Sequence, residues 1–233
     1  MPYRRLPKTD AARLKALKTL LGNNNIYVVR NRFLDWKTIN QAQTMHDKLL
    51  TAYEQYKISA KAQSRNGVKY AKLLRNARLY VSHFLQVLLM SFERGEIKKT
   101  HKELYGLKDE DTKLPNMQTI QGLIKWGEKV IKGEQTRIKE GGRPIYNPTI
   151  GMVSTHLSIF KEFYNQQKNA EKRTKQALKT LQLLRPEVDE VLLDIWNQVE
   201  SHFSHEPIIT RINACKEYGL IYYYRKNEKK DER

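Results

Sequence analysis

The stretch that decides the fold is NARLYVSHFLQVLLMSFE, residues 76–93. Its apolar residues recur at steps of three and four, which is the spacing of one face of an α-helix. A second stretch, PEVDEVLLDIWNQVESHF at 186–203, repeats this pattern. We therefore predict two helices with broad apolar faces, and we expect Pro186 in the first turn of the second, where its missing N–H costs nothing. The expected core positions are Val81, Phe84, Leu85, Leu88 and Phe92, then Val191, Leu192, Ile195, Trp196, Val199 and Phe203.

The two stretches belong to a longer internal repeat. Leu6-Pro7-Lys8-Thr9 recurs as Leu114-Pro115-Asn116-Met117, and Leu73-Leu74-Arg75 recurs as Leu183-Leu184-Arg185. Lys102-Glu103-Leu104-Tyr105-Gly106-Leu107 returns as Lys216-Glu217-Tyr218-Gly219-Leu220 with one residue deleted. The matches keep their order at offsets of 108 to 114 residues. Such a long period predicts a duplicated supersecondary unit.

The predicted fold is all-α, with two tandem, internally duplicated units of four helices each. The first repeat covers residues 1–107, the second covers 108–220, and a charged tail follows at 221–233. Thr9 is suited to cap the first helix, and glycine at 106 and 219 is suited to end the fourth helix of each repeat. The other helices are expected near 9–22, 35–63 and 76–93, and near 116–139, 150–183 and 186–203.

Strand-forming sequence is scarce. Residues 26–29 (IYVV) and 220–224 (LIYYY) are β-branched or aromatic runs beside turn residues, a composition typical of short strands. They could pair with each other as one two-stranded ribbon.

The charge of the chain is strongly positive and unevenly distributed. There are 43 Lys and Arg against 25 Asp and Glu, a net charge of +18. The first repeat holds 21 basic against seven acidic residues, whereas the second holds 17 against 15. Because such a charge concentrates polyanions, nucleic acid or the ribosome is the expected partner.

A row of cations in the first repeat is the expected contact with phosphates. The row begins at Lys57 and ends at Lys72, and its five members lie four, four, four and three residues apart. A continuous helix would place them on one face, where they repel one another. A polyanion would relieve that repulsion, although the same spacing also fits a solvated helix surface. The predicted nucleic-acid-binding residues are Lys57, Lys61, Arg65, Lys69 and Lys72 in this row, Arg4 and Arg5 as a flexible arm, and Lys168 and Lys172, with Lys175 and Lys179, in a second row. The second row is expected to contribute less to nucleic-acid affinity because its repeat is nearly neutral.

Aromatic residues interleave with these cations. Tyr53, Tyr56 and Tyr70 could stack on nucleic-acid bases. Their helical spacing also fits a role in the core, which is the more frequent use of such a pattern.

Most catalytic chemistry can be set aside from the sequence. It contains no Walker loop, no Gly-x-Gly-x-x-Gly and no His-Glu-x-x-His motif, so we expect a non-enzymatic protein without a cofactor or metal. The single cysteine, Cys215, excludes an internal disulfide and is expected to pack as a small apolar residue. His202 and His205 could offer two metal ligands, but a third is not evident. The acidic cluster Glu187, Asp189, Glu190 and Asp194 is explained by the helix macrodipole.

Two other hypotheses remain open beside nucleic-acid binding. One is a helical scaffold or adaptor for an acidic protein, and the more remote one is an enzyme of unknown class. The longest apolar run, from Phe84 to Met90, is far shorter than the roughly 20 residues of a membrane span. The N-terminus also lacks the apolar segment of a signal peptide, so we expect a cytoplasmic protein.

The sequence has Tyr3-Arg4-Arg5-Leu6-Pro7-Lys8-Thr9-Asp10 at its start and Tyr218-Gly219-Leu220 near its end. These two stretches resemble an uncharacterised family of bacterial proteins. These motifs describe where helices begin and end. The resemblance therefore implies no activity and assigns no functional residue.

Overall fold

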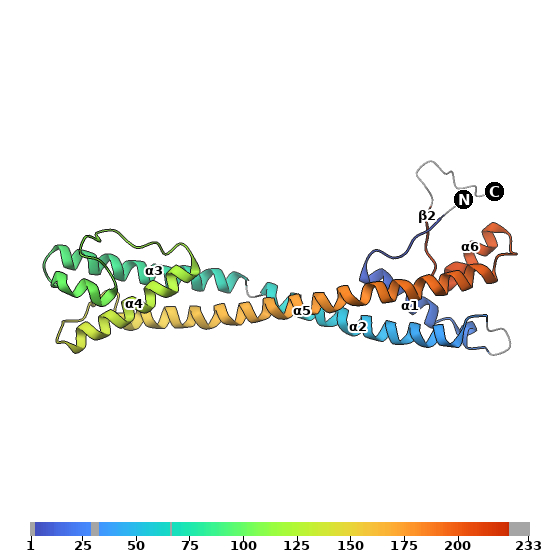
Figure 1. Ribbon diagram of the computed structural model, residues 1–233, viewed down its shortest axis with the longest axis horizontal. Helices are drawn as coiled ribbons and strands as arrows, with labels where there is room; N and C mark the ends of the chain where they lie inside the picture. Colours follow the sequence, from blue (N-terminus) through green and yellow to red (C-terminus); the bar gives the residue numbers. More distant parts are fainter. Residues whose placement is uncertain (1–2, 29–32, 66, 224–233) are drawn as a thin grey trace. The chain divides into compact units, whose positions relative to one another are not determined.

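The computed structural model describes residues 3–28, 33–65 and 67–223 and is predominantly helical (Figure 1). This confirms the predicted all-α class. The α-helices are α1 (Asp10–Leu21), α2 (Trp36–Arg65), α3 (Gly67–Glu93), α4 (Ile120–Lys139), α5 (Ile150–His202) and α6 (Ile208–Glu217). Two 3₁₀ helices, η1 (Asn24–Tyr27) and η3 (Lys99–Tyr105), and two short strands, β1 (Tyr3–Arg4) and β2 (Tyr222–Tyr223), complete the described elements.

The chain forms two compact units, and each unit contains segments from both predicted repeats. Unit 1 consists of residues 1–61 and 172–233, and unit 2 consists of residues 62–171. The predicted repeat boundary at 107 thus lies inside unit 2. Unit 1 combines α1 and most of α2 with the second part of α5 and α6, whereas unit 2 combines α3 and η3 with α4 and the first part of α5.

The core of unit 1 is built around the second apolar stretch. Ile195, Trp196 and Val199 are at most 1% exposed and pack with residues of α1 and α2 such as Leu17 and Leu49. Thr9 caps α1 as predicted, because its Oγ1 accepts a hydrogen bond from the Ala12 N–H at 3.2 Å. Cys215 is buried and free in this core, as the sequence predicted.

The core of unit 2 is built around the first apolar stretch. Val81, Phe84, Leu85 and Leu88 are all fully buried and pack with residues of α4 and α5. The backbone of α4 approaches its neighbours closely at Gly133, where an added Cβ would lie 2.6 Å from Tyr105 Cδ1 and 2.7 Å from the Leu104 carbonyl oxygen. Gly133 is therefore required by packing rather than by a turn.

The predicted ends of the fourth helices are correct. Gly106 follows η3 with φ +67°, and Gly219 follows α6 with φ +87°. Both values lie in the left-handed region that glycine tolerates. After each glycine a leucine, Leu107 or Leu220, is buried in the core of its unit.

The predicted ribbon between 26–29 and 220–224 is wrong in one of its strands. Residues 24–27 form the 3₁₀ helix η1 instead, and Asn23 Oδ1 accepts a hydrogen bond from the Asn25 N–H at 3.1 Å. A side chain that bonds the local backbone in this way competes with strand pairing. β2 pairs antiparallel with β1, with Tyr3 opposite Tyr223. Val29 and Tyr224 of the predicted strands lie outside the described residues.

The predicted helix boundary before Pro186 does not occur. α5 runs without interruption for 53 residues and contains Pro186 in its interior. A proline there removes one backbone hydrogen bond and costs about 3 kcal/mol. Burial of the flanking residues Leu181 and Val188, both fully buried, offsets that cost.

Candidate nucleic-acid interface

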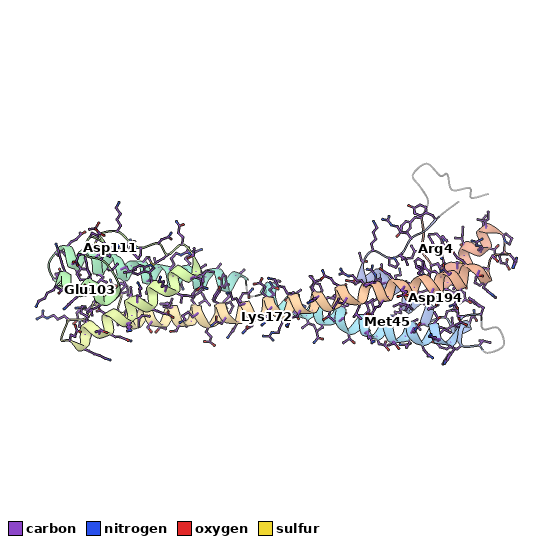
Figure 2. All side chains as sticks on the ribbon, viewed as in Figure 1. Arg4, Met45, Glu103, Asp111, Lys172 and Asp194 are labelled. Carbon is purple, nitrogen blue, oxygen red and sulfur yellow. The ribbon has the colours of Figure 1, made fainter. Side chains whose placement is uncertain are left out.

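The cations of the predicted first row are exposed and lie on α2 and α3. α2 ends at Arg65 and α3 begins at Gly67, so Lys57, Lys61 and Arg65 lie on α2 and the other two cations on α3. The second row lies on α5, on which Lys172 is labelled in Figure 2. Exposed side chains at both rows are Lys57, Lys61, Arg65, Lys69, Lys72, Lys168, Lys172, Lys175 and Lys179.

Two further cations on α3 extend the first row. Arg75 and Arg78 are exposed and continue it at steps of three residues from Lys72. Arg78 Nη2 donates a hydrogen bond to the Gln118 carbonyl oxygen at 2.8 Å, which fixes this side chain against the segment before α4. No Asp or Glu occurs between Glu54 and Glu93. The absence of acids over this span was the sequence signal that could have identified both arginines.

Aromatic rings support three of these cations. The Lys57 ammonium lies 5.3 Å from the centre of the Tyr53 ring, and Lys69 lies at the same distance from the Phe163 ring. Lys168 lies 5.0 Å from the Tyr164 ring, and a hydrogen bond to Tyr164 raises the pKa of its ammonium. A cation over a ring face is attracted by the ring quadrupole, so these side chains are held in place while they stay charged.

The tyrosines considered for base stacking belong to the cores. Tyr53 and Tyr56 are partly buried against the core of unit 1. Tyr70 packs in unit 2, with its ring centre 5.9 Å from that of Phe160 and 6.4 Å from that of Tyr164. The core interpretation of their spacing therefore describes all three residues.

Arg4 is engaged within unit 1. It lies in β1, where its Nη1 donates to Glu200 Oε2 at 2.9 Å and its Nη2 donates to Asn197 Oδ1 at 2.6 Å. Glu200 also accepts a hydrogen bond from the Tyr222 hydroxyl at 2.7 Å. These bonds tie β1 and β2 to α5, so Arg4 is an anchored residue rather than part of a flexible arm. The Arg5 side chain, by comparison, is exposed.

The net charge is shared almost evenly between the two units. Unit 1 contains 24 Lys and Arg against 14 Asp and Glu, a net of +10, and unit 2 contains 19 against 11, a net of +8. The difference between the repeats disappears because each unit takes segments from both. Lys168 and Lys172 were assigned a smaller role because the second repeat is nearly neutral. That reason does not apply to the units, since both are strongly positive.

A buried polar cluster in unit 2 resembles a catalytic constellation in composition but is enclosed. Glu134 and Arg137 are 0% and 3% exposed. Glu134 accepts hydrogen bonds from the Tyr105 hydroxyl at 2.5 Å, from Arg137 Nη2 at 2.7 Å and from the Ile145 N–H at 3.1 Å. Burial and the neighbouring Glu134 carboxylate raise the pKa of Tyr105 well above its usual value. Because every partner is already satisfied inside the core, the cluster stabilises the packing of η3 on α4.

The acidic residues at 187–194 have two kinds of role. Asp189 accepts a bidentate pair of hydrogen bonds from Arg13 of α1, both at 2.7 Å, and Asp194 accepts one from the Thr38 hydroxyl of α2 at 2.8 Å. These contacts hold helices together, a function that the macrodipole interpretation missed. Glu187 and Glu190, in contrast, are exposed.

The histidines singled out from the sequence do not gather ligands. The His202 ring stacks on Phe33 with ring centres 3.9 Å apart. Over residues 3–28, 33–65 and 67–223, no group of three His, Cys, Asp or Glu side chains is placed to hold a metal ion.

In the described part of the chain, no helix combines the length and apolar character needed to cross a membrane. Comparison of the chain with protein-family models, with curated protein sequences and with solved structures finds no match.

Proposed function

We propose that this protein binds nucleic acid through phosphate contacts made by the exposed cations of α2, α3 and α5. The observation that supports the proposal best is the span from residue 55 to residue 92, which carries seven Lys and Arg and no acid, all seven of them exposed. Like charges at helical spacing destabilise the free protein. Binding to a phosphate backbone would offset that repulsion. It would also release the counterions condensed on the nucleic acid, and the entropy of their release favours binding.

The cations of α5 contribute to the same function. Lys168, Lys172, Lys175 and Lys179 follow one another at steps of four, three and four on one helix, so they lie on one side of it. Phosphate contacts of this kind position a partner without specifying its sequence. We therefore expect affinity for DNA and RNA with little discrimination between sequences.

The test is charge reversal at the α2 cations. The variant Lys57→Glu/Lys61→Glu/Arg65→Glu should weaken binding to a fluorescent duplex for all sequences alike and reduce the salt slope by about three, one for each lost contact. The matched control is Lys99→Glu/Lys113→Glu/Lys139→Glu, which changes the net charge equally at exposed positions elsewhere. Equal losses in both variants would mean that net charge alone, and not this surface, determines binding.

A second candidate function, binding of an acidic protein, is favoured by one observation on α3. A shallow hollow there combines apolar side chains with arginine guanidinium groups. It is lined by Ala71, Leu74, Arg75, Arg78, Leu79 and Ser82. Exposed apolar surface beside cations suits a protein better than a phosphate backbone.

A further inference from the structure

Unit 2 presents an exposed face on α3 that mixes cations with aliphatic side chains. Val68, Lys72, Arg75 and Leu79 follow one another at steps of four, three and four, which places them within about 60° of the helix circumference. Val68 is 87% exposed and Leu79 is 59% exposed, so neither contributes to the core of unit 2. We call these four residues the basic face. It has two cations between two aliphatic side chains.

Unit 1 presents a face of the opposite charge on α5. Leu183, Glu187, Glu190 and Leu193 lie within about 120° of the helix circumference. Leu183 is 63% exposed and Leu193 is 40% exposed. Among the ion pairs of the described residues, none involves Glu187 or Glu190. We call these four residues the acidic face.

We propose that the protein associates with a second copy of itself by pairing the basic face of one copy with the acidic face of another. The two charged residues in each face are three positions apart, so Lys72 and Arg75 can meet Glu187 and Glu190 together. The faces also match in length, at about 16 Å from Val68 to Leu79 and about 15 Å from Leu183 to Leu193. Contact between the aliphatic ends would remove four exposed apolar side chains from water.

Charge complementarity favours a second copy of the chain over nucleic acid as the partner of the basic face. Nucleic acid would satisfy Lys72 and Arg75 but would leave Val68 and Leu79 without apolar partners. It would also be repelled by the acidic face. Because the two faces differ, the contact is heterologous, and each chain can bind one neighbour through each face. The association should therefore grow with protein concentration and weaken with salt, which screens exposed charges.

The experiment measures the mass of the full chain by sedimentation velocity from about 1 µM to about 1 mM, the range of weak specific association. The protein is first treated with nuclease and freed of nucleic acid. The variants are Lys72→Glu/Arg75→Glu in the basic face and Glu187→Lys/Glu190→Lys in the acidic face. Controls with equal charge change are Lys132→Glu/Lys139→Glu and Glu206→Lys/Glu217→Lys, all at exposed positions.

We expect the parent and both controls to associate, and each face variant alone to raise the dissociation constant at least about tenfold. An equimolar mixture of the two face variants should associate again, because each supplies the partner that the other needs. The chain carrying all four changes should also associate. A parent that stays monomeric over the whole range, or a mixture no stronger than its components, would overturn the proposal.

The same variants keep this proposal separate from nucleic-acid binding, although Lys72 belongs to both surfaces. Glu187→Lys/Glu190→Lys adds positive charge, so it should bind duplex at least as tightly as the parent while losing self-association. If that variant lost both properties, the acidic face would have another role and the pairing would be wrong.

Discussion

The hydrogen bonds of the buried Tyr105–Glu134–Arg137 cluster allow us to predict how much one substitution should lower the free energy of unfolding. In Glu134→Gln, the carboxylate that faces the Arg137 guanidinium is replaced by a neutral amide. Each oxygen of the Glu134 carboxylate accepts two hydrogen bonds. In the variant, an NH₂ group replaces one of these oxygens, so that a donor faces the donors that the oxygen had accepted from. Removing one partner of a buried ion pair costs about 3–5 kcal/mol. Since only 3% of Arg137 is exposed, water can do little to replace the lost carboxylate, and we expect a loss of that size.

The assay is urea unfolding followed by circular dichroism and by the fluorescence of the three tryptophans, of which Trp126 lies in unit 2 and Trp36 and Trp196 lie in unit 1. Tyr105→Phe removes a single hydroxyl from the cluster and should cost less, about 1–3 kcal/mol. Glu140→Gln is the control, because Glu140 is exposed beyond the end of α4 and should change stability by less than about 0.5 kcal/mol. A Glu134→Gln variant as stable as this control, or more stable than the parent, would refute the structural role and favour a strained functional site.

The remaining predictions concern the helices and the arrangement of the units. Pro186→Ala should stabilise the protein by about 1–3 kcal/mol in thermal unfolding, because it restores a backbone donor inside α5. Tyr105 and Tyr222 have raised pKa values, so the folded state keeps their protons longer than the unfolded state does. Stability should thus be intact below pH about 10 and fall above it, and alkaline absorbance titration should show these two tyrosines ionising late. A protease site inserted after Lys113 should yield two fragments that co-elute after cleavage, because each unit needs helices from both sides of the cut; separate elution would contradict the assignment of units.

The sequence identified what depends on local pattern. The apolar spacing at 81–92 and 191–203, the Thr9 cap and the terminal glycines all describe interactions within a few residues, and the structure bears out each of them. Pro186 misled the prediction because burial of flanking residues overcame a local preference. The β-branched and aromatic run that begins at Ile26 misled it in the opposite direction, since residues 24–27 form a 3₁₀ helix beside the local hydrogen bond of Asn23.

Relations between distant segments could not be predicted from the same patterns. Tyr105 and Glu134 are 29 residues apart, and no periodicity connects them. Likewise, offsets near 111 residues suggested tandem repeats, but sequence similarity does not specify which helices pack together. Whether the two repeats arose by duplication stays a prediction, while the units show that segments of both share each core. The exposed cations were identified correctly as surface residues because hydrophilic positions at helical spacing report the outer face of a helix.

The central claim is that exposed cations bind phosphate backbones, and salt titration tests it most directly. Anisotropy of a fluorescent duplex should be measured with the parent protein at several salt concentrations, with a single-stranded RNA in parallel. If the cations supply about four phosphate contacts, the logarithm of the affinity should fall against the logarithm of salt concentration with a slope of about −3 to −4 for the duplex. Duplexes of unrelated sequence should give the same line. Absence of binding at low salt, or affinity that does not change with salt, would contradict the account.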